Sequence, residues 1–287
     1  MERKRFSKSH LIAIDSDGCV FDGMNMKQRL AFIPTAIAEF GLEEHAELYT
    51  KTAEEVNLFS ALRGCNRFKA LWCSLSLCKK RANARLGLPD LSALESFITS
   101  NLPLSNATLQ TLIANNPSPI LVKSLIWSEN TNQKVAKFSS QIPIFKDVRE
   151  SLKSASNNSD IMVCSAASNN TLEDEWEKAE LTPYVNFIAG QEYGPKHQQI
   201  LNVSRLGSFE KDKILMIGDA LSDLNAANNA GVRFYPIIPG SEEVSWTAFV
   251  HTVLPDFLKG KYSIDDQNDF VQKLNNALQP CEIQIPS

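Results

Sequence analysis

Short apolar runs that end in a polar residue recur along this chain. The first covers residues 11–14 and is followed at once by Asp15, Ser16, Asp17 and Gly18. A short apolar run that is bounded by a turn signal predicts a buried strand. By the same pattern we predict further strands at residues 161–164, 185–189, 214–217 and 233–238.

Helical patterns alternate with these later strands. We predict helices at residues 146–156, 170–180, 196–206 and 223–230, and two more at 242–258 and 266–278. Strands that alternate with helices imply right-handed crossovers and a parallel sheet. The fold class that we predict is therefore α/β, with a doubly wound, Rossmann-like sheet.

The chain between residues 21 and 145 has a different pattern, with helical periodicity and no strand-like runs. We predict helices at residues 26–40, 66–87, 90–100, 105–114 and 129–140, the first of them kinked or delayed by Pro34. The predicted organisation is a discontinuous α/β core, residues 1–20 and 146–287, with an all-helical domain, residues 21–145, inserted in it.

Two acids follow the first strand. Asp17 and Gly18 could simply form a turn, which is a common use of Asp-Gly, but that reading leaves Asp15 unexplained. Open α/β sheets bind ligands at the carboxyl ends of their strands. Two carboxylates so close together need a nearby cation or a shifted pKa, so we expect a metal or a perturbed acid here.

Three later stretches repeat this design. Gly218 and Asp219 end a strand, Asp223 begins a helix, Ser165 ends another strand, and Lys196 lies in a first helical turn. Ser165 and Asp223 could instead be helix caps. Lys196 could be solvated, but a cation is disfavoured at a helix N-terminus, so its position favours a functional role.

In this order the motifs resemble those of the haloacid dehalogenase superfamily, most of whose members are phosphohydrolases. The resemblance covers the first twenty residues and roughly residues 145–255. Cys19 departs from the family pattern, in which a threonine or small aliphatic residue is more usual. The helical insert resembles the cap domains that close over the active site in this superfamily.

The resemblance implies a role for each acid near the amino terminus. Asp15 would be the nucleophile that forms an aspartyl-phosphate. Asp17 would protonate the leaving oxygen and then activate the attacking water. Members that cleave carbon–halogen or phosphonate bonds lack an acid at this position, so Asp17 points to phosphate esters.

The resemblance also implies a Mg²⁺ site and a phosphate site. The metal ligands would be Asp15, the main-chain carbonyl of Asp17, and Asp219, with Asp223 as a ligand or an orienting residue. Ser165 and Lys196 would bind the phosphoryl group.

The substrate that we expect is a small phosphorylated metabolite, since a helical cap excludes bulky molecules. Arg63, Arg67 and Lys69 are the candidate specificity residues, although the pattern favours a loop followed by an ordinary amphipathic helix whose charged residues face water. A phosphomutase with the same chemistry, or a non-catalytic phosphate-binding protein on the same fold, are the alternatives.

Composition narrows the class further. A net charge of −4 gives no support to nucleic-acid binding. No apolar stretch is long enough to span a membrane or to form a signal peptide, so we expect a cytoplasmic protein. The six cysteines have no metal-ligand spacing and are expected to be reduced thiols. No feature of the sequence indicates an oligomeric state.

Overall fold

The structure is a computed structural model that describes residues 6–82 and 86–285. Its contacts divide the chain into two compact units. One, the α/β unit, comprises the chain up to Gly23 together with Ile142–Ala277. The other, the helical unit, comprises Met24–Gln141 together with the segment that follows Ala277.

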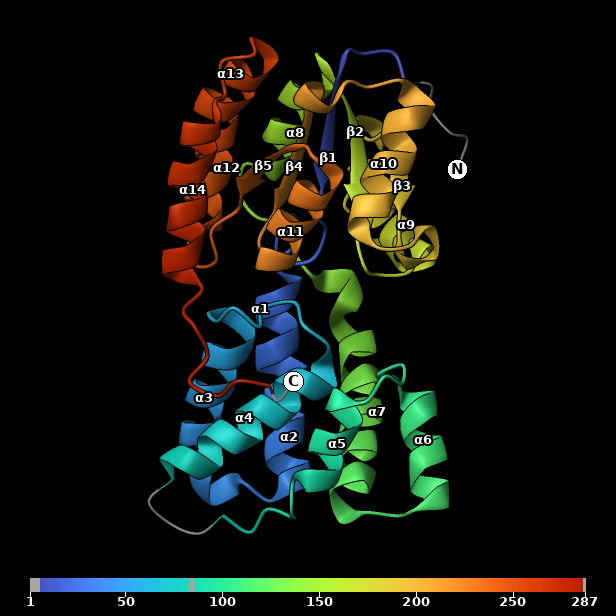
Figure 1. Cartoon of the computed structure of the whole chain (residues 1–287), viewed down its shortest axis with the longest axis vertical. Coiled ribbons are helices and arrows are strands. Elements are labelled where there is room, and N and C mark those ends of the chain that lie inside the picture. Colours follow the sequence, from blue (N-terminus) through green and yellow to red (C-terminus); the bar gives the residue numbers. More distant parts are fainter. Residues whose placement is uncertain (1–5, 83–85, 286–287) are drawn as a thin grey trace. The chain divides into compact units, whose positions relative to one another are not determined.

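The α/β unit is built on one parallel sheet with the strand order β3-β2-β1-β4-β5 (Figure 1). Every residue of β2 and β4 is buried, which requires cover on both faces of the sheet. The predicted α/β fold class is confirmed. The strands are β1 His10–Ile14, β2 Ser159–Cys164, β3 Phe187–Ala189, β4 Ile214–Gly218 and β5 Arg233–Pro236.

Helices follow the strands in the α/β unit much as predicted. They are α8 Val148–Ser156, α9 Asn169–Lys178, α10 Lys196–Gly207, α11 Leu221–Ala230, α12 Glu242–Ala248, α13 Leu254–Leu258 and α14 Ile264–Ala277. The short 3₁₀ turns are η4 Thr182–Tyr184, η5 Gln191–Tyr193 and η6 Lys211–Lys213. A π-helical turn, η7 Phe249–Val253, joins α12 to α13 just before Pro255.

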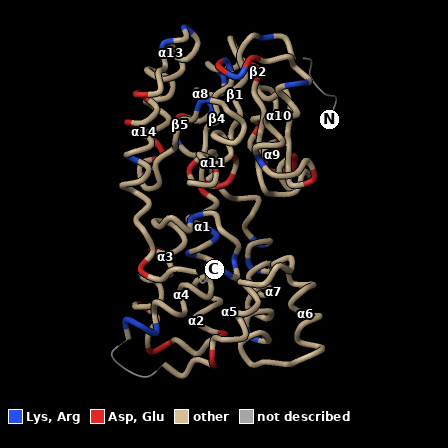
Figure 2. The backbone as a smooth tube through the Cα atoms, viewed as in Figure 1, with Lys and Arg blue, Asp and Glu red and all other residues tan. Residues whose placement is uncertain are grey.

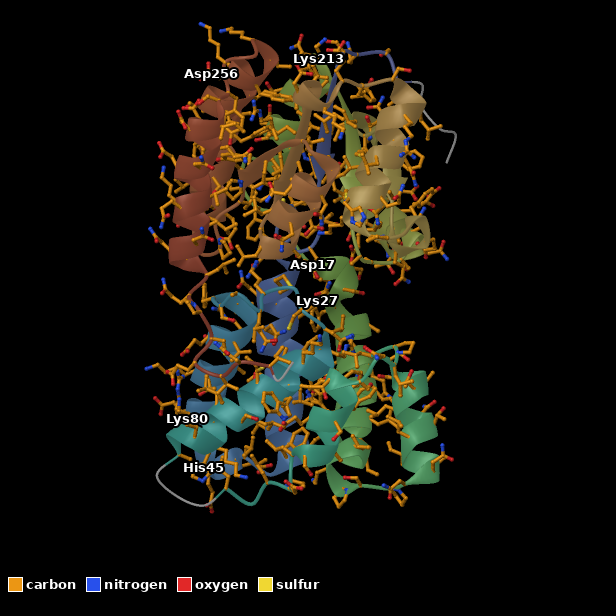
Figure 3. All side chains as sticks on the ribbon, viewed as in Figure 1. Asp17, Lys27, His45, Lys80, Lys213 and Asp256 are labelled. Atoms are coloured by element: carbon orange, nitrogen blue, oxygen red, sulfur yellow. The ribbon has the colours of Figure 1, made fainter. Side chains whose placement is uncertain are left out.

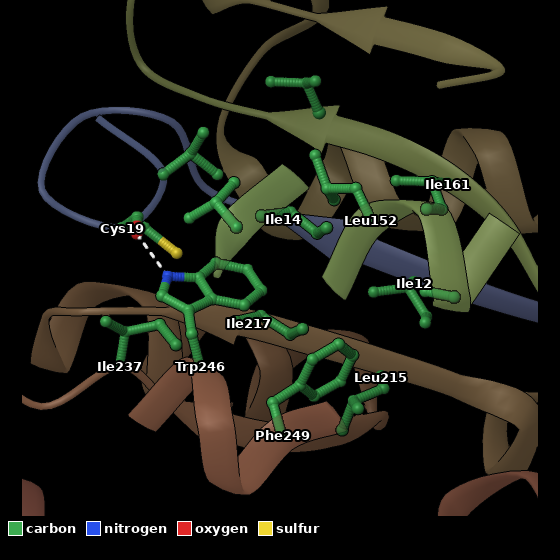
Figure 4. Packing of buried hydrophobic residues seen from close by; sticks show 14 of the residues in the cluster. Ile12, Ile14, Cys19, Leu152, Ile161, Leu215, Ile217, Ile237, Trp246 and Phe249 are labelled. Atoms are coloured by element: carbon green, nitrogen blue, oxygen red, sulfur yellow. Dashed lines mark hydrogen bonds between the residues drawn. The ribbon is translucent and has the colours of Figure 1, made fainter. Parts of the chain in front are cut away.

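One hydrophobic cluster lies between the sheet and the helices on one of its faces. It joins Ile12 and Ile14 of β1 to Leu215 of β4 and to Phe249 of η7 (Figure 4). At its edge the fully buried indole of Trp246 donates a hydrogen bond of 2.9 Å from Nε1 to the carbonyl oxygen of Cys19. The cluster therefore also anchors the loop that follows β1.

The helical unit contains only helices among the elements that the structure assigns to it. They are α1 Gly23–Lys27, whose first residue belongs to the α/β unit, η1 Gln28–Phe32, α2 Ile33–Phe40, η2 Glu43–His45, α3 Ala46–Leu58, α4 Arg67–Arg81, α5 Ser92–Thr99, α6 Asn106–Asn115, α7 Pro119–Phe138 and η3 Ser139–Gln141.

The kink predicted at Pro34 takes the form of a π-helical turn. Proline has no backbone N–H, so it cannot complete the regular α-helical ladder. The turn before it, η1, widens instead, and the N–H of Ile33 donates to the carbonyl oxygen of Gln28, five residues earlier. Gln28 and Phe32 are positioned by this turn, and turns of this kind often occur at functional sites.

Three helices of this unit differ from the sequence prediction. We predicted no helix at α3, whose buried face includes the polar residue Thr52 beside Tyr49 and Val56 and so is not a continuous apolar stripe. The predicted 129–140 helix is the second half of α7, which begins at Pro119, a favoured first residue of a helix. The predicted 66–87 helix ends at Arg81, and residues 83–85 lie outside the described residues.

The carboxyl-terminal segment differs from the predicted division, in which it belonged to the α/β core. The backbone of Gln279 pairs with Phe59 and Ala61, with hydrogen bonds of 3.0 Å each. Further on, the Glu282 carboxylate pairs with Arg81, and Ile283 packs against the core of the helical unit. Cys281, Ile283 and Ile285 alternate with polar residues and pack against that core, but the stretch is too short for its pattern to identify the unit on which it docks.

Acidic and basic residues occur in both units, and neither unit carries charge of one sign only (Figure 2). All six cysteines are free thiols, as expected. Within the described residues, none of the helices has both the length and the apolar character needed to cross a membrane.

Replacing Trp246 by phenylalanine tests how far this core stabilises the loop. The variant loses the buried hydrogen bond to the Cys19 carbonyl, so we expect a loss of about 1–3 kcal/mol in the free energy of unfolding. Urea unfolding measures it. A loss below about 0.5 kcal/mol, which is the ordinary scatter of surface substitutions, would show that the hydrogen bond from Trp246 does not stabilise the fold.

Candidate active site

Polar side chains follow three neighbouring strands of the sheet. Asp15 comes after β1, Ser165 after β2, and Asp219 after β4. The ladder continues one residue past β1, since the N–H of Asp15 donates to the carbonyl oxygen of Ile217 at 2.9 Å. Because the strands are parallel neighbours, all three side chains leave the sheet at one edge, as the sequence predicted.

Three carboxylates meet at this edge. Oxygen atoms of Asp15, Asp219 and Asp223 lie within 4.8 Å of one another, and all three residues are buried. A compact set of carboxylate oxygens is the donor type that Mg²⁺ prefers. The side chains therefore fit a hard divalent cation. The further ligand predicted for it, the main-chain carbonyl of Asp17, stays a prediction.

Lys196, the first residue of α10, places its ammonium group between two of these acids. Its Nζ lies 2.9 Å from Oδ2 of Asp15 and 2.5 Å from Oδ1 of Asp223. Burial lowers the pKa of Lys196, but the two carboxylates outweigh it and hold that pKa well above its usual value. The unfavourable position of a cation at a helix start is thus offset by two ion pairs.

The surroundings of Asp15 favour its protonated form and so raise its pKa. Burial raises the pKa of Asp15 to about 8; Lys196 opposes the rise, and Asp223 and Asp219 add to it. A divalent cation bound at this edge would offset the repulsion that Asp223 and Asp219 exert on the Asp15 carboxylate.

Asp223 is both a helix cap and a partner of the lysine. Its Oδ2 accepts the backbone N–H groups of Asp219 at 3.2 Å and Ala220 at 3.1 Å, while Oδ1 pairs with Lys196. Gly218 makes room for it, since a Cβ there would lie 2.4 Å from the Asp223 carboxyl carbon. The two readings that the sequence left open are therefore compatible.

Ser165 is not a helix cap, because Ser168 is the N-cap residue of α9. The Ser165 oxygen accepts the N–H of Ala167 at 3.2 Å. The hydrogen of its hydroxyl has no acceptor among the residues that the structure describes. It is therefore available to donate to a bound oxyanion.

Gln199 and Trp176 support the site, and sequence reasoning missed both. The Gln199 side-chain nitrogen donates to the carbonyl oxygens of Ser165 at 2.9 Å, Gly190 at 2.9 Å and Gly194 at 2.8 Å. The buried Trp176 donates to the Ser16 hydroxyl at 3.0 Å. Only the fold brings these distant residues together, so no local signal could have revealed them.

Asp17 lies in a tight turn beyond β1 (Figure 3). Gly18 has a φ of +86°, a left-handed conformation that favours glycine, and its N–H donates to the carbonyl oxygen of Phe21 at 2.8 Å. Gly23 packs directly against the Asp17 carboxylate, since a Cβ there would lie 2.0 Å from Asp17 Oδ1. The orientation of Asp17 thus depends on a glycine six residues later.

The three candidate specificity residues all belong to the helical unit. Arg63 is buried and donates from Nη1 to the carbonyl oxygen of Leu58 at 3.0 Å, which caps the end of α3. Arg67 lines a pocket within this unit, and Lys69 does not line it. The structure therefore separates the three residues that the sequence grouped together.

The comparisons with known proteins agree with this geometry. The family model for haloacid dehalogenase-like hydrolases matches residues 77–237, more than half of the chain. The chain belongs to this family. The matched region contains Ser165, Lys196, Asp219 and Asp223, and the ion pair between Lys196 and Asp15 connects the amino-terminal acids to it.

Solved structures with a similar fold have little sequence identity to this chain. A haloacid dehalogenase-like family hydrolase from Xanthomonas campestris has 10% identity and a TM-score of 0.48, over 90% of this chain and 99% of that one. A HAD-superfamily hydrolase of subfamily IA from Geobacter sulfurreducens has 16% identity and a TM-score of 0.44, over 81% and 89%. The L-2-haloacid dehalogenase of Xanthobacter autotrophicus has 15% identity and a TM-score of 0.41, over 88% and 86%. No curated protein sequence matches the chain significantly.

The raised pKa of Asp15 predicts an unusual pH dependence of stability without divalent cations. Below pH 8 the folded state keeps a proton that the unfolded chain, with an Asp pKa near 3.9, releases above about pH 4. The contribution of this group to stability therefore falls as pH rises from about 4 to 8. Mg²⁺ should stabilise the chain more at pH 9 than at pH 6.

Thermal unfolding of the native chain and of Asp15→Asn, in EDTA and in Mg²⁺, measures this dependence. The difference between the two proteins isolates Asp15 from the other titrating groups. A difference that does not change with pH in EDTA would contradict the raised pKa.

Proposed function

We propose that this chain is a Mg²⁺-dependent phosphohydrolase that acts on a small phosphorylated metabolite through an aspartyl-phosphate on Asp15. The observation that carries the proposal is the contact of Lys196 with both Asp15 and Asp223, beside Asp219. Phosphoryl transfer requires a nucleophile, a cation and carboxylates that can hold a metal ion, and these groups lie at one edge of the sheet.

In the first step an oxygen of Asp15 attacks phosphorus and the ester oxygen leaves. Asp17 gives its proton to that oxygen, so that an alcohol departs and the phosphoryl group remains bound to Asp15. In the second step water attacks the same phosphorus and gives its proton to Asp17. The bond to Asp15 breaks, inorganic phosphate is released, and both carboxyl groups return to their initial states.

Lys196 and Ser165 stabilise the charge on the transferring group. The Lys196 ammonium is held beside Asp15 before substrate arrives, so little reorganisation is needed during the reaction. The Ser165 hydroxyl supplies a hydrogen-bond donor. Bound Mg²⁺, held by Asp15, Asp219 and the Asp17 carbonyl, with Asp223 beside them, would neutralise negative charge on the phosphoryl oxygens.

The presence of Asp17 supports phosphate esters as the substrate class. A carbon–halogen bond has no leaving oxygen that needs a proton, whereas the alkoxide that leaves a phosphate ester does. The turn at Gly18 and the space beside Gly23 hold a carboxylate at this position. A phosphomutase would need the same acid, and the acceptor of the phosphoryl group distinguishes the two activities.

Replacing Asp15 by asparagine removes the proposed nucleophile with little change of shape. We expect Mg²⁺-dependent hydrolysis of phenyl phosphate, measured as released phosphate, to fall by at least about a thousandfold. Asp212→Asn is the matched control, because Asp212 is exposed at the opposite end of the sheet. Equal activity of the Asp15 variant and the native chain would refute the proposed nucleophile.

Adding one methyl group at Gly23 tests the role of Asp17 without removing it. Gly23→Ala forces the Asp17 carboxylate to rotate away, so we expect kcat to fall at least about tenfold with little change in the unfolding midpoint. In Gly87→Ala the added Cβ meets nothing within 4 Å, which makes it the control. Full activity of Gly23→Ala would show that the orientation of Asp17 does not matter.

A further inference from the structure

The helical unit contains a pocket that its own residues line. Its apolar walls include Phe32 and Trp127, and four polar residues line it beside Arg67: Gln28, Tyr49, Asn57 and Ser74. Polar and apolar residues line the pocket in equal number, so its polar groups can orient a small molecule whose apolar part contacts the aromatic walls.

Arg67 is partly buried in this pocket and is oriented by its neighbours. Its Nη1 donates to the Ser128 hydroxyl at 3.0 Å and to Oδ1 of Asn132 at 2.7 Å, both on α7. Its guanidinium carbon lies 5.2 Å from the centre of the Phe32 ring. Nη1 therefore positions the guanidinium, and the Phe32 ring packs against the face of the guanidinium.

The other edge of the guanidinium has no protein partner. Within the described residues, neither Nε nor Nη2 of Arg67 has a hydrogen-bond acceptor, and no carboxylate lies within ion-pair distance. These two nitrogens form the side-on pair of donors that binds both oxygens of a carboxylate. Burial lowers the pKa of Arg67, which is the cost of a cation without a counter-charge.

Two further polar groups of the pocket also lack partners. Tyr49 is 2% exposed, and no residue in the described part of the chain bonds to its hydroxyl. The side-chain nitrogen of Gln28 donates to Oδ1 of Asn57 at 3.2 Å, which leaves the Gln28 oxygen as an acceptor. Because both residues line the pocket, the Tyr49 hydroxyl is available to a ligand as a donor and the Gln28 oxygen as an acceptor, and a carboxylate can use only the donor.

We propose that this pocket binds a small carboxylate, with the Nε–Nη2 edge of Arg67 as its anchor and the Tyr49 hydroxyl as a second donor. The π-helical turn η1 supports this reading, because it brings both Gln28 and Phe32 to the pocket. The carboxylate belongs either to the substrate of the proposed hydrolase or to a separate small molecule.

Acetate is the probe for the anchor, and acetamide, its uncharged isostere, is the control ligand. Trp127 lines the pocket, so a fluorescence titration of the full chain at constant ionic strength reports binding. We expect acetate to saturate with a Kd on the order of millimolar, and acetamide not to bind. Acetate that fails to saturate, or that binds no better than acetamide, would overturn the proposal.

Variants identify the residue that binds. We expect Arg67→Gln to weaken acetate binding at least about tenfold, and Tyr49→Phe by a few-fold. Arg67→Lys keeps the charge but loses the paired donors, so it should lie between Arg67→Gln and the native chain. Lys79→Gln removes an exposed charge from the same helix and should bind like the native chain. If all four variants bound acetate with the affinity of the native chain, the proposal would be overturned. If Arg67→Gln does not fold, Arg67→Lys and Tyr49→Phe provide the same test.

A second experiment distinguishes the two sources of the carboxylate. Unlike the acetate titration, it rests on the proposed function. It compares hydrolysis of phenyl phosphate and 4-carboxyphenyl phosphate. A preference for the carboxylated ester that Arg67→Gln abolishes assigns the carboxylate to the substrate. Acetate binding at Arg67 without such a preference supports a separate small molecule. A chain that binds acetate but hydrolyses neither ester contradicts the proposed hydrolase and leaves the pocket assignment intact.

Discussion

The convergence of three buried carboxylates at one edge of a parallel sheet is the constraint on which the site depends. Asp15, Asp219 and Asp223 are buried within 4.8 Å of one another, and Lys196 is the cation that the structure places between two of them. Asp223 and Asp219 raise the pKa of Asp15, so the site is suited to a divalent cation that would offset this repulsion. The proposed phosphoryl transfer rests on this cluster.

The surrounding fold holds these charges in place. Parallel pairing brings the ends of β1, β2 and β4 to one edge, and α10 and α11 each begin with a residue of the charge cluster in their first turn. Trp246 and Trp176 hold the loop after β1 against the core, because their indole N–H groups donate buried hydrogen bonds to Cys19 and Ser16 of that loop. Glycines at 218 and 23 leave the space that two of the acids occupy. Function here depends on residues that carry no chemistry of their own.

The sequence was sufficient for the parts that local pattern determines. Apolar strands that end in Asp15, Ser165 and Asp219 predicted both the parallel sheet and the edge where these residues meet. Helix α3 was missed because its buried face includes the polar residue Thr52. The apolar residues near Ile283 alternate over too short a stretch to show on which unit the tail docks. Gln199 and Trp176 act through contacts between distant segments, so no short stretch of sequence could reveal them.

Trapping the covalent intermediate tests the central claim most directly. The chain is mixed with an excess of phenyl phosphate and Mg²⁺, quenched, and reduced with borohydride, which converts an aspartyl-phosphate to homoserine; peptide mass spectrometry then locates the change. The account predicts homoserine at position 15, formed only with substrate. Turnover that leaves Asp15 unmodified, or that modifies another aspartate instead, would contradict it.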